Sequence, residues 1–144
     1  MRILLVAILM FIGNDLMATS ADNLATEKII ELTVDKSGII HTGRDTITTD
    51  DLPRYIQERL FKSYAGTGKM YDAIHLRSGD GGPDATTLET IIKKIREGQE
   101  RALNELCLQK YKKTYGAIDE KKKEKIKKQF PVLFQLDYLP NSSN

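Results

Sequence analysis

The sequence contains few of the residues on which disulfide frameworks and metal centres depend, and it has no long apolar run of the kind that spans a membrane. Its 144 residues include one cysteine, two histidines, four prolines and no tryptophan. A single thiol cannot form an internal disulfide, so packing alone must hold the fold together. Structural zinc needs four nitrogen or sulfur ligands, which this composition does not supply. The longest apolar run, Ile3–Ile12, has ten residues, fewer than the roughly 20 that a membrane-spanning helix needs.

That apolar run nevertheless indicates where in the cell the protein is located. One positive charge precedes it and small residues at 18–21 follow it, as in a secretory signal peptide. We interpret residues 1–21 as a signal peptide or a short N-terminal anchor, and residues 22–28 as a linker. The expected protein is exported or periplasmic, with residues 3–21 as the segment that would contact or anchor in the inner membrane.

The remaining composition is that of an ordinary soluble domain, with 40% hydrophobic and 29% charged residues and a formal net charge of +2. Charge is nevertheless unevenly distributed. Lys110–Lys128 holds nine lysines and three acidic residues, a net charge of +6, which leaves −4 for the rest of the chain. Such a segment could face phosphates or anionic lipid, but it is also typical of a solvated Lys/Glu-rich helix. A nucleic-acid surface is not favoured, because 22 basic and 20 acidic residues leave no dominant basic face.

The longest periodic segment, Thr86–Tyr115, predicts the main helix. Its apolar face is formed by residues at three- and four-residue steps, together with one glutamine: Leu88, Ile91, Ile92, Ile95, Gln99, Ala102, Leu103 and Leu106. Thr86 and Glu89 have the spacing of a capping box at the start of the helix. Gly116 predicts its end, because glycine tolerates the positive φ of a C-terminal cap.

Strands are predicted before this helix. Ile30–Val34 alternates apolar and polar residues, and Ile39–Thr42 resumes extended structure after a turn at Asp35–Gly38, so the two form a hairpin. Thr46–Thr48 and Tyr71–Arg77 are further extended segments. Between these two segments the pattern predicts a second helix.

Capping residues mark the ends of the remaining helices. Asp50 predicts the start of the second helix, with Pro53 in its first turn, and Gly66–Gly68 predicts its end. Asp119 predicts the start of a Lys-rich helix that Pro131 ends. An apolar stretch after it suggests one last strand.

These elements predict an α+β fold, a small mixed β-sheet with two main helices packed on one face plus a Lys-rich C-terminal helix. The crossover from Thr48 to Tyr71 permits parallel pairing between the strands that it joins. We place the α+β domain at residues 29–115 and a C-terminal extension at 116–144.

Few residues are candidates for chemistry. The loop Gly79–Gly82 precedes a helix but matches no nucleotide-binding motif, so we interpret it as a flexible connection. His41 and His75 could form a metal site with Asp45 or Asp80, although their spacing matches no known motif. Cys107 is expected to be a buried structural thiol. The sequence thus predicts no catalytic, cofactor-binding or metal-binding residue, and a protein that is not an enzyme.

Several of these segments together resemble the periplasmic domain of the ExbD/TolR family of biopolymer-transport proteins. The segments that carry the resemblance are Ile30–Ile40, Asp50–Leu52, Ala73–Arg77, Asp80, Ala102–Leu106 and the Lys-rich tail up to Pro131, which looks like the longer C-terminal end of one branch of the family. The likeness covers roughly residues 29–139.

The resemblance implies a non-enzymatic role in a TonB/Tol-type energy-transduction system. Family members work beside a proton-conducting ExbB/TolQ-like membrane protein, bind TonB- or TolA-like proteins, and form homodimers through the periplasmic domain. Small sheets with an open edge recruit such partners by strand addition. The family's aspartate for proton handling lies near the start of a full transmembrane helix. Here Asp15 lies beyond the short apolar run, so that role is not assigned to it.

Two alternatives remain at this stage. The chain could be a standalone exported structural or peptide-binding protein with no transport role. It could also be a small exported hydrolase that uses His41 or His75 with an acidic residue.

Overall fold

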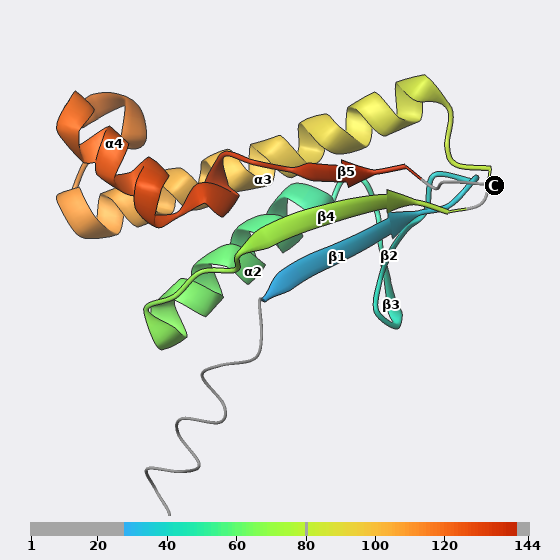
Figure 1. Ribbon diagram of the computed structural model, residues 1–144, viewed down its shortest axis with the longest axis horizontal. Coiled ribbons are helices and arrows are strands. Elements are labelled where there is room, and N and C mark those ends of the chain that lie inside the picture. The colour runs from blue at the N-terminus through green and yellow to red at the C-terminus, as the bar shows by residue number, and fades with distance from the viewer. Residues whose placement is uncertain (1–27, 80, 141–144) are drawn as a thin grey trace, which may run out of the picture.

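The computed structural model describes residues 28–79 and 81–140, and within them shows a five-stranded mixed β-sheet with helices packed on one face (Figure 1). The predicted α+β fold is confirmed. The strand order across the sheet is β3-β2-β1-β4-β5. The strands are β1 (Ile29–Val34), β2 (Ile40–Thr42), β3 (Asp45–Ile47), β4 (Ala73–Ser78) and β5 (Asp137–Leu139).

The predicted hairpin is formed by β1 and β2, which pair antiparallel. Its turn is closed by Asp35, whose Oδ1 accepts hydrogen bonds from the backbone N–H of Ser37 at 2.8 Å and of Ile39 at 3.0 Å. Gly38 has a φ of +83°, a conformation that glycine adopts without steric cost. β3 pairs antiparallel with β2 and forms one edge of the sheet.

The centre of the sheet is a parallel pair, β1 and β4, in register over six residues. The crossover permits parallel pairing between the strands that it joins, β3 and β4, but β4 pairs with β1 and β5 instead. The physical reason is burial. β1 presents the fully buried side chains of Ile30, Leu32 and Val34, whereas two of the three residues of β3 are exposed. Pairing with β1 therefore removes more apolar surface from water.

Two long helices, α2 (Leu52–Thr67) and α3 (Ala85–Tyr111), cover the same face of the sheet (Figure 1). The largest fully buried side chains come from these helices, the strands and one residue of the C-terminal segment: Ile30, Leu32, Ile40, Leu52, Ile56, Leu60, Ile74, Leu76, Ile91, Ile95, Leu106 and Ile126. The helices approach each other closely at Gly98, where an added Cβ would lie 2.6 Å from Cβ of Ile56 and 2.7 Å from the carbonyl oxygen of Pro53.

Both predicted ends of α3 are wrong. The helix is capped by Asp84, whose side chain accepts a hydrogen bond from the N–H of Thr87 at 2.7 Å, so Thr86 lies inside the first turn. At the other end Lys112 takes the left-handed conformation itself, with a φ of +61°, before Gly116 is reached. The early exit is held by Asn104, whose Oδ1 accepts a hydrogen bond from the N–H of Tyr115 at 3.0 Å.

The prediction for α2 holds at one end. Pro53 lies in the first turn, and Gly68 ends the helix with a φ of +75°, as predicted. The flanking residue at the start is Asp51 and not Asp50, and it makes no side-chain cap. Its carboxylate instead contacts Arg54 at 3.1 Å and accepts a hydrogen bond from the hydroxyl of Thr48 at 3.0 Å.

The C-terminal residues are part of the same core. After a short 3₁₀ turn, η1 (Tyr115–Ala117), the side chain of Asp119 caps α4 (Glu120–Gln129). A second 3₁₀ turn, η2 (Pro131–Leu133), then leads to β5, which pairs parallel with β4. The buried side chains of this segment are Ile118, Ile126, Phe130, Val132 and Leu133.

Candidate functional site

The most distinctive open feature of the fold is the outer edge of β5. β5 pairs with β4 on one side and is the last strand of the sheet in the described part of the chain. Asp137 and Tyr138 are exposed, and Leu139 is half-buried. An edge strand presents unpaired backbone N–H and C=O groups, and another extended segment can pair with them. β5 therefore offers a place where the sheet can be continued by a partner.

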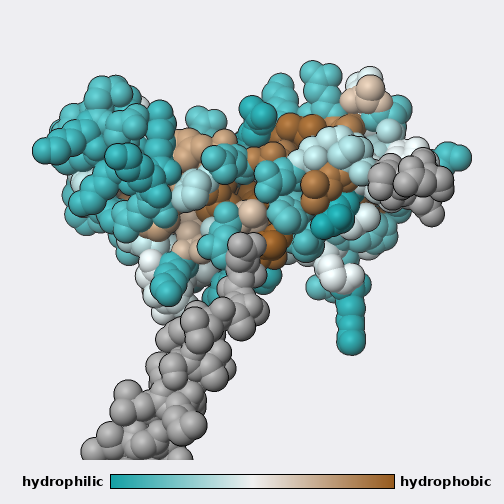
Figure 2. Space-filling view, in the orientation of Figure 1, coloured by the Kyte–Doolittle hydropathy of each residue, from teal (hydrophilic) through white to brown (hydrophobic). Residues whose placement is uncertain are grey.

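A groove lies beside the residues that lead into β5. It has a volume of about 200 Å³ and is lined by Arg96, Gln99, Glu100 and Leu103 of α3 and by Leu133, Phe134 and Leu136. The side chain of Phe134 is 38% exposed and packs at 5.8 Å, centroid to centroid, against Tyr115. Figure 2 shows hydrophobic surface over β5 and the adjoining part of α3. A strand added at β5 would thus also meet apolar side chains.

The register of β5 decides which of its side chains face this groove. Tyr138 is the partner of buried Leu76, so it lies on the side of the sheet that α3 covers. Its hydroxyl is hydrogen-bonded to the hydroxyl of Ser78 at 2.6 Å. Asp137 and Leu139 alternate with it and lie on the open face. A partner strand would therefore run beside Tyr138 and against α3.

Gln99 fixes the position of the segment before β5. It is the only buried polar side chain in the described core, with 4% exposure. Its Nε2 donates hydrogen bonds to the carbonyl oxygens of Val132 and Gln135, each at 2.8 Å. A buried polar group of this kind is stabilising only when all its partners are present. The one glutamine on the predicted apolar face of α3 therefore holds the C-terminal segment against this helix through two hydrogen bonds.

The open face of the sheet carries a row of two carboxylates and one imidazole. Glu31, His75 and Asp137 stand at the same level of β1, β4 and β5. Nδ1 of His75 lies 3.4 Å from Oε1 of Glu31, and its Nε2 lies 3.4 Å from Oδ2 of Asp137. Nδ1 is buried and has no hydrogen-bond partner among the described residues. The row thus places one side chain from each of β1, β4 and β5 in contact across the open face of the sheet.

The other histidine, His41, contacts a carboxylate that is neither of the two the sequence left open. Nε2 of His41 lies 2.9 Å from Oδ2 of Asp35. This hydrogen bond, and those from the backbone at Ile39 and Ser37, lower the pKa of the Asp35 carboxyl below its ordinary value. The structure thus joins His41 to Asp35 and not to Asp45.

The two histidines do not form a joint site. They lie on β2 and β4, with β1 between them. The described residues contain no cluster of three or more histidine, cysteine or acidic side chains that could hold a metal ion. Asp80, the other carboxylate that the sequence left open, lies outside the described residues.

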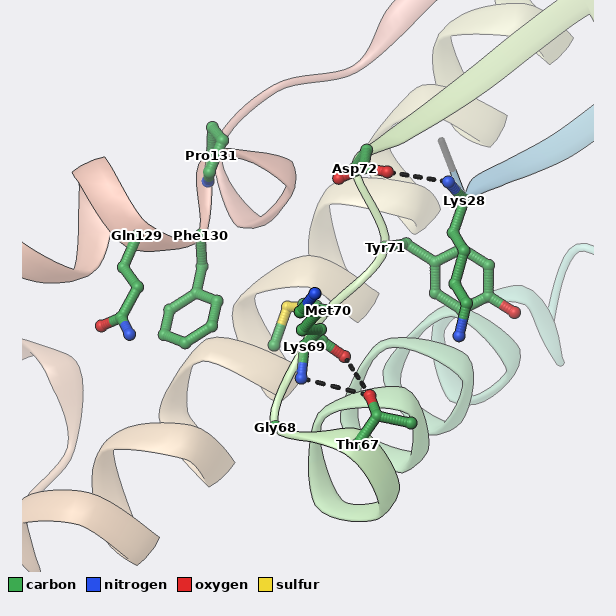
Figure 3. Close-up of a pocket in the computed structure, with 10 residues that line it drawn as sticks. All are labelled: Lys28, Thr67, Gly68, Lys69, Met70, Tyr71, Asp72, Gln129, Phe130 and Pro131. Carbon is green, nitrogen blue, oxygen red and sulfur yellow. Dashed lines mark hydrogen bonds between the residues drawn. The ribbon is translucent and has the colours of Figure 1, made fainter. Parts of the chain in front are cut away.

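Another cleft lies at the N-terminal ends of the central strands β1 and β4 (Figure 3). It has a volume of about 690 Å³ and is lined by Lys28, by residues 67–72 and by residues 129–131. Its polar groups are largely used within the fold. Oδ2 of Asp72 accepts a hydrogen bond from the N–H of Lys28 at 2.7 Å, and Oγ1 of Thr67 bonds both the N–H and the C=O of Lys69. Figure 3 shows no convergent set of polar side chains here, so the cleft offers no evident chemistry.

Cys107 is fully buried, as predicted, and burial raises the pKa of its thiol. It is therefore not a reactive nucleophile. The predicted leader at 1–21, including Asp15, and nearly all of the linker lie outside the described residues. Within the described ranges, no helix combines the length and the apolar character that crossing a bilayer requires.

From the sequence, no role in a site was assigned to Asp137, Tyr138 or Gln99. Asp137 and Tyr138 stood in an apolar stretch whose strand was only suggested, and no pattern in the sequence links Asp137 to Glu31 or His75. Gln99 was recognisable, because a single amide on an otherwise apolar helix face indicates a buried hydrogen-bonding role. Comparison of the sequence with protein-family models and with curated proteins found no match.

Proposed function

We propose that this chain is a non-enzymatic, periplasmic module of an ExbD/TolR-like energy-transduction system. In this proposal it binds an extended segment of a TonB- or TolA-like envelope protein by strand addition at β5, and acts beside an ExbB/TolQ-like membrane protein. The observation that carries the proposal is the open outer edge of β5, with the groove of α3 next to it.

Strand addition agrees with the contacts around this edge. The backbone of β5 offers hydrogen bonds, and alternate side chains of the added strand would meet the groove formed by α3 and Phe134. Gln99 and the hydroxyl pair of Tyr138 and Ser78 hold the edge in place. A preorganised edge strand lowers the ordering cost of binding.

The hydrolase alternative has weaker support. Each histidine lies beside a carboxylate, as a general base would require. Within the described residues, however, neither imidazole is hydrogen-bonded to a hydroxyl or a thiol, and the row around His75 lies on an open sheet face. Acid–imidazole contacts without a nucleophile or an enclosing cleft favour a structural role.

Site-specific photo-cross-linking in intact envelopes tests the proposal. A benzophenone amino acid at position 138 is expected to cross-link the chain to a TonB- or TolA-like protein. The matched control is the same amino acid at Thr46, an exposed position on β3 at the other edge of the sheet, and little product is expected there. Mass spectrometry of the products identifies the partner.

Two results would contradict the proposal. One is the absence of any TonB/Tol-type component from the products of position 138. The other is a product that contains only a second copy of this chain, which would assign the β5 edge to a homodimer.

A further inference from the structure

Lysine side chains are concentrated at one end of the molecule, where α4 follows the C-terminal end of α3. We call residues Lys110–Lys128 the basic lobe. It contains nine lysines and three acidic residues, for a net charge of +6. Figure 2 shows the surface around α4 as strongly hydrophilic. Helix α4, which carries six of the nine lysines, lies away from β5 (Figure 1), whereas Tyr115 of the lobe contacts Phe134 beside the groove.

The acidic residues of the lobe are already paired. Each contacts one lysine three residues further along α4, with N···O distances of 3.3–3.7 Å, in the pairs Asp119–Lys122, Glu120–Lys123 and Glu124–Lys127. Among the described residues, the other six lysines make no ion pair: Lys110, Lys112, Lys113, Lys121, Lys125 and Lys128. Buried Ile126 anchors α4 to the core, so these charges are held on a folded surface.

The kind of basic residue distinguishes among anionic partners. The lobe contains no arginine. Arginine gives bidentate recognition of carboxylate and phosphate and is enriched in protein interfaces, whereas lysine is a hydrated point charge that such interfaces contain less often. Neither cleft described above includes a lysine of the lobe. The lobe therefore fits a broad anionic surface better than a protein partner or a small ligand.

The aromatic side chains of the lobe argue against nucleic acid. Tyr111 and Tyr115 are half-buried against the core. The ammonium of Lys122 lies 5.1 Å from the ring centroid of Tyr111, and that of Lys123 lies 5.4 Å from the ring centroid of Tyr115. Single-stranded nucleic acids are bound through aromatic rings whose faces are free to stack on bases. Here lysine ammonium groups already occupy ring faces.

We propose that the basic lobe binds the anionic headgroups of a phospholipid membrane surface. Clustered lysines are attracted to such a surface, and their contributions add up. Leu108, which is 48% exposed, stands one helical turn before Lys112 and supplies an apolar contact at the same end of α3. Apolar side chains next to lysines are typical of surfaces that lie at the membrane interface. The proposal is independent of partner binding at β5.

Vesicle binding of the full chain tests this proposal. The probes are phosphatidylcholine vesicles with and without phosphatidylglycerol, and the variant is K121Q/K125Q/K128Q. Glutamine and lysine have similar helix propensities, so α4 is expected to remain folded. Each lysine near an anionic surface raises the affinity about fivefold, so the variant, which lacks three, should bind the anionic vesicles on the order of a hundredfold more weakly. Raising the salt to about 1 M, where the Debye length is about 3 Å, should have a comparable effect on the unmodified chain.

The matched control is K36Q/K62Q/K93Q, which removes the same charge from exposed positions outside the basic lobe. It should keep the preference for anionic vesicles to within about threefold, because these positions lie away from the bound surface. The apolar run Ile3–Ile12 is present in every variant, so any binding that it gives is common to all. Equal losses in the two variants, or equal binding of the unmodified chain to both kinds of vesicle, would overturn the proposal.

Discussion

Gly98→Ala is expected to lower the free energy of unfolding by about 2 kcal/mol. The added Cβ would lie 2.6 Å from Cβ of Ile56 and 2.7 Å from the carbonyl oxygen of Pro53, so α2 and α3 must move apart. Overpacking of this kind costs about 1–3 kcal/mol, and the upper end applies because one of the neighbours is backbone. The better helix propensity of alanine returns about 1 kcal/mol. Urea unfolding followed by circular dichroism measures the difference.

The matched control for this prediction is Gly66→Ala. Gly66 lies in α2, and an added Cβ there would meet no atom within 4 Å. The same substitution should therefore stabilise the protein by about 1 kcal/mol at this site. Stabilisation of both variants would show that the two helices do not pack closely at Gly98.

Gln99→Met is expected to lower the free energy of unfolding by about 3 kcal/mol. Methionine has nearly the same length but no N–H, so the carbonyl oxygens of Val132 and Gln135 both lose their donor. A buried acceptor left without a partner costs about 1–3 kcal/mol. The loss should be largest around β5, because Gln99 holds the segment that leads into it. Equilibrium unfolding and the cross-linking yield from position 138 should therefore fall together.

Gln109→Met serves as the control for this substitution. Gln109 is exposed near the C-terminal end of α3, and surface changes of this kind usually alter stability by less than about 0.5 kcal/mol. If the Gln99 variant matched this control in stability and in cross-linking, the hydrogen bonds of Gln99 could not be what holds the C-terminal segment in place.

The parts of the fold that the sequence predicts are those set by periodicity. The alternation in Ile30–Val34 and the three- and four-residue spacing of α3 specify which faces are apolar. Burial of Ile30, Leu32, Ile91, Ile95 and Leu106 agrees with both patterns. Pro53 and Gly68 were also predictable, because each residue has a strong conformational preference at a helix end.

The exact ends of α3 were not predictable, because neighbouring residues compete for the capping positions. Asp84 and Thr86 are both good capping residues, and only the folded chain shows that Asp84 takes the position. Lys112 adopts a left-handed conformation that its side chain disfavours, because Asn104 and the core hold the chain after it.

The candidate site depends on long-range register. His75 meets Glu31 and Asp137 only because β1, β4 and β5 align at that level, across 44 and 62 residues of sequence. A three-residue strand such as β5 has too little pattern of its own to predict this alignment.

Amide hydrogen exchange at Asp137–Leu139, with and without the cross-linked partner protein, measures strand addition at β5 directly. If a partner strand pairs with the outer edge, the outward N–H groups of β5 gain hydrogen bonds, and their exchange should slow by at least tenfold, while β3 stays unchanged. Unchanged exchange at β5 in the saturated complex, or slowing at β3 in its place, would contradict partner binding at this edge.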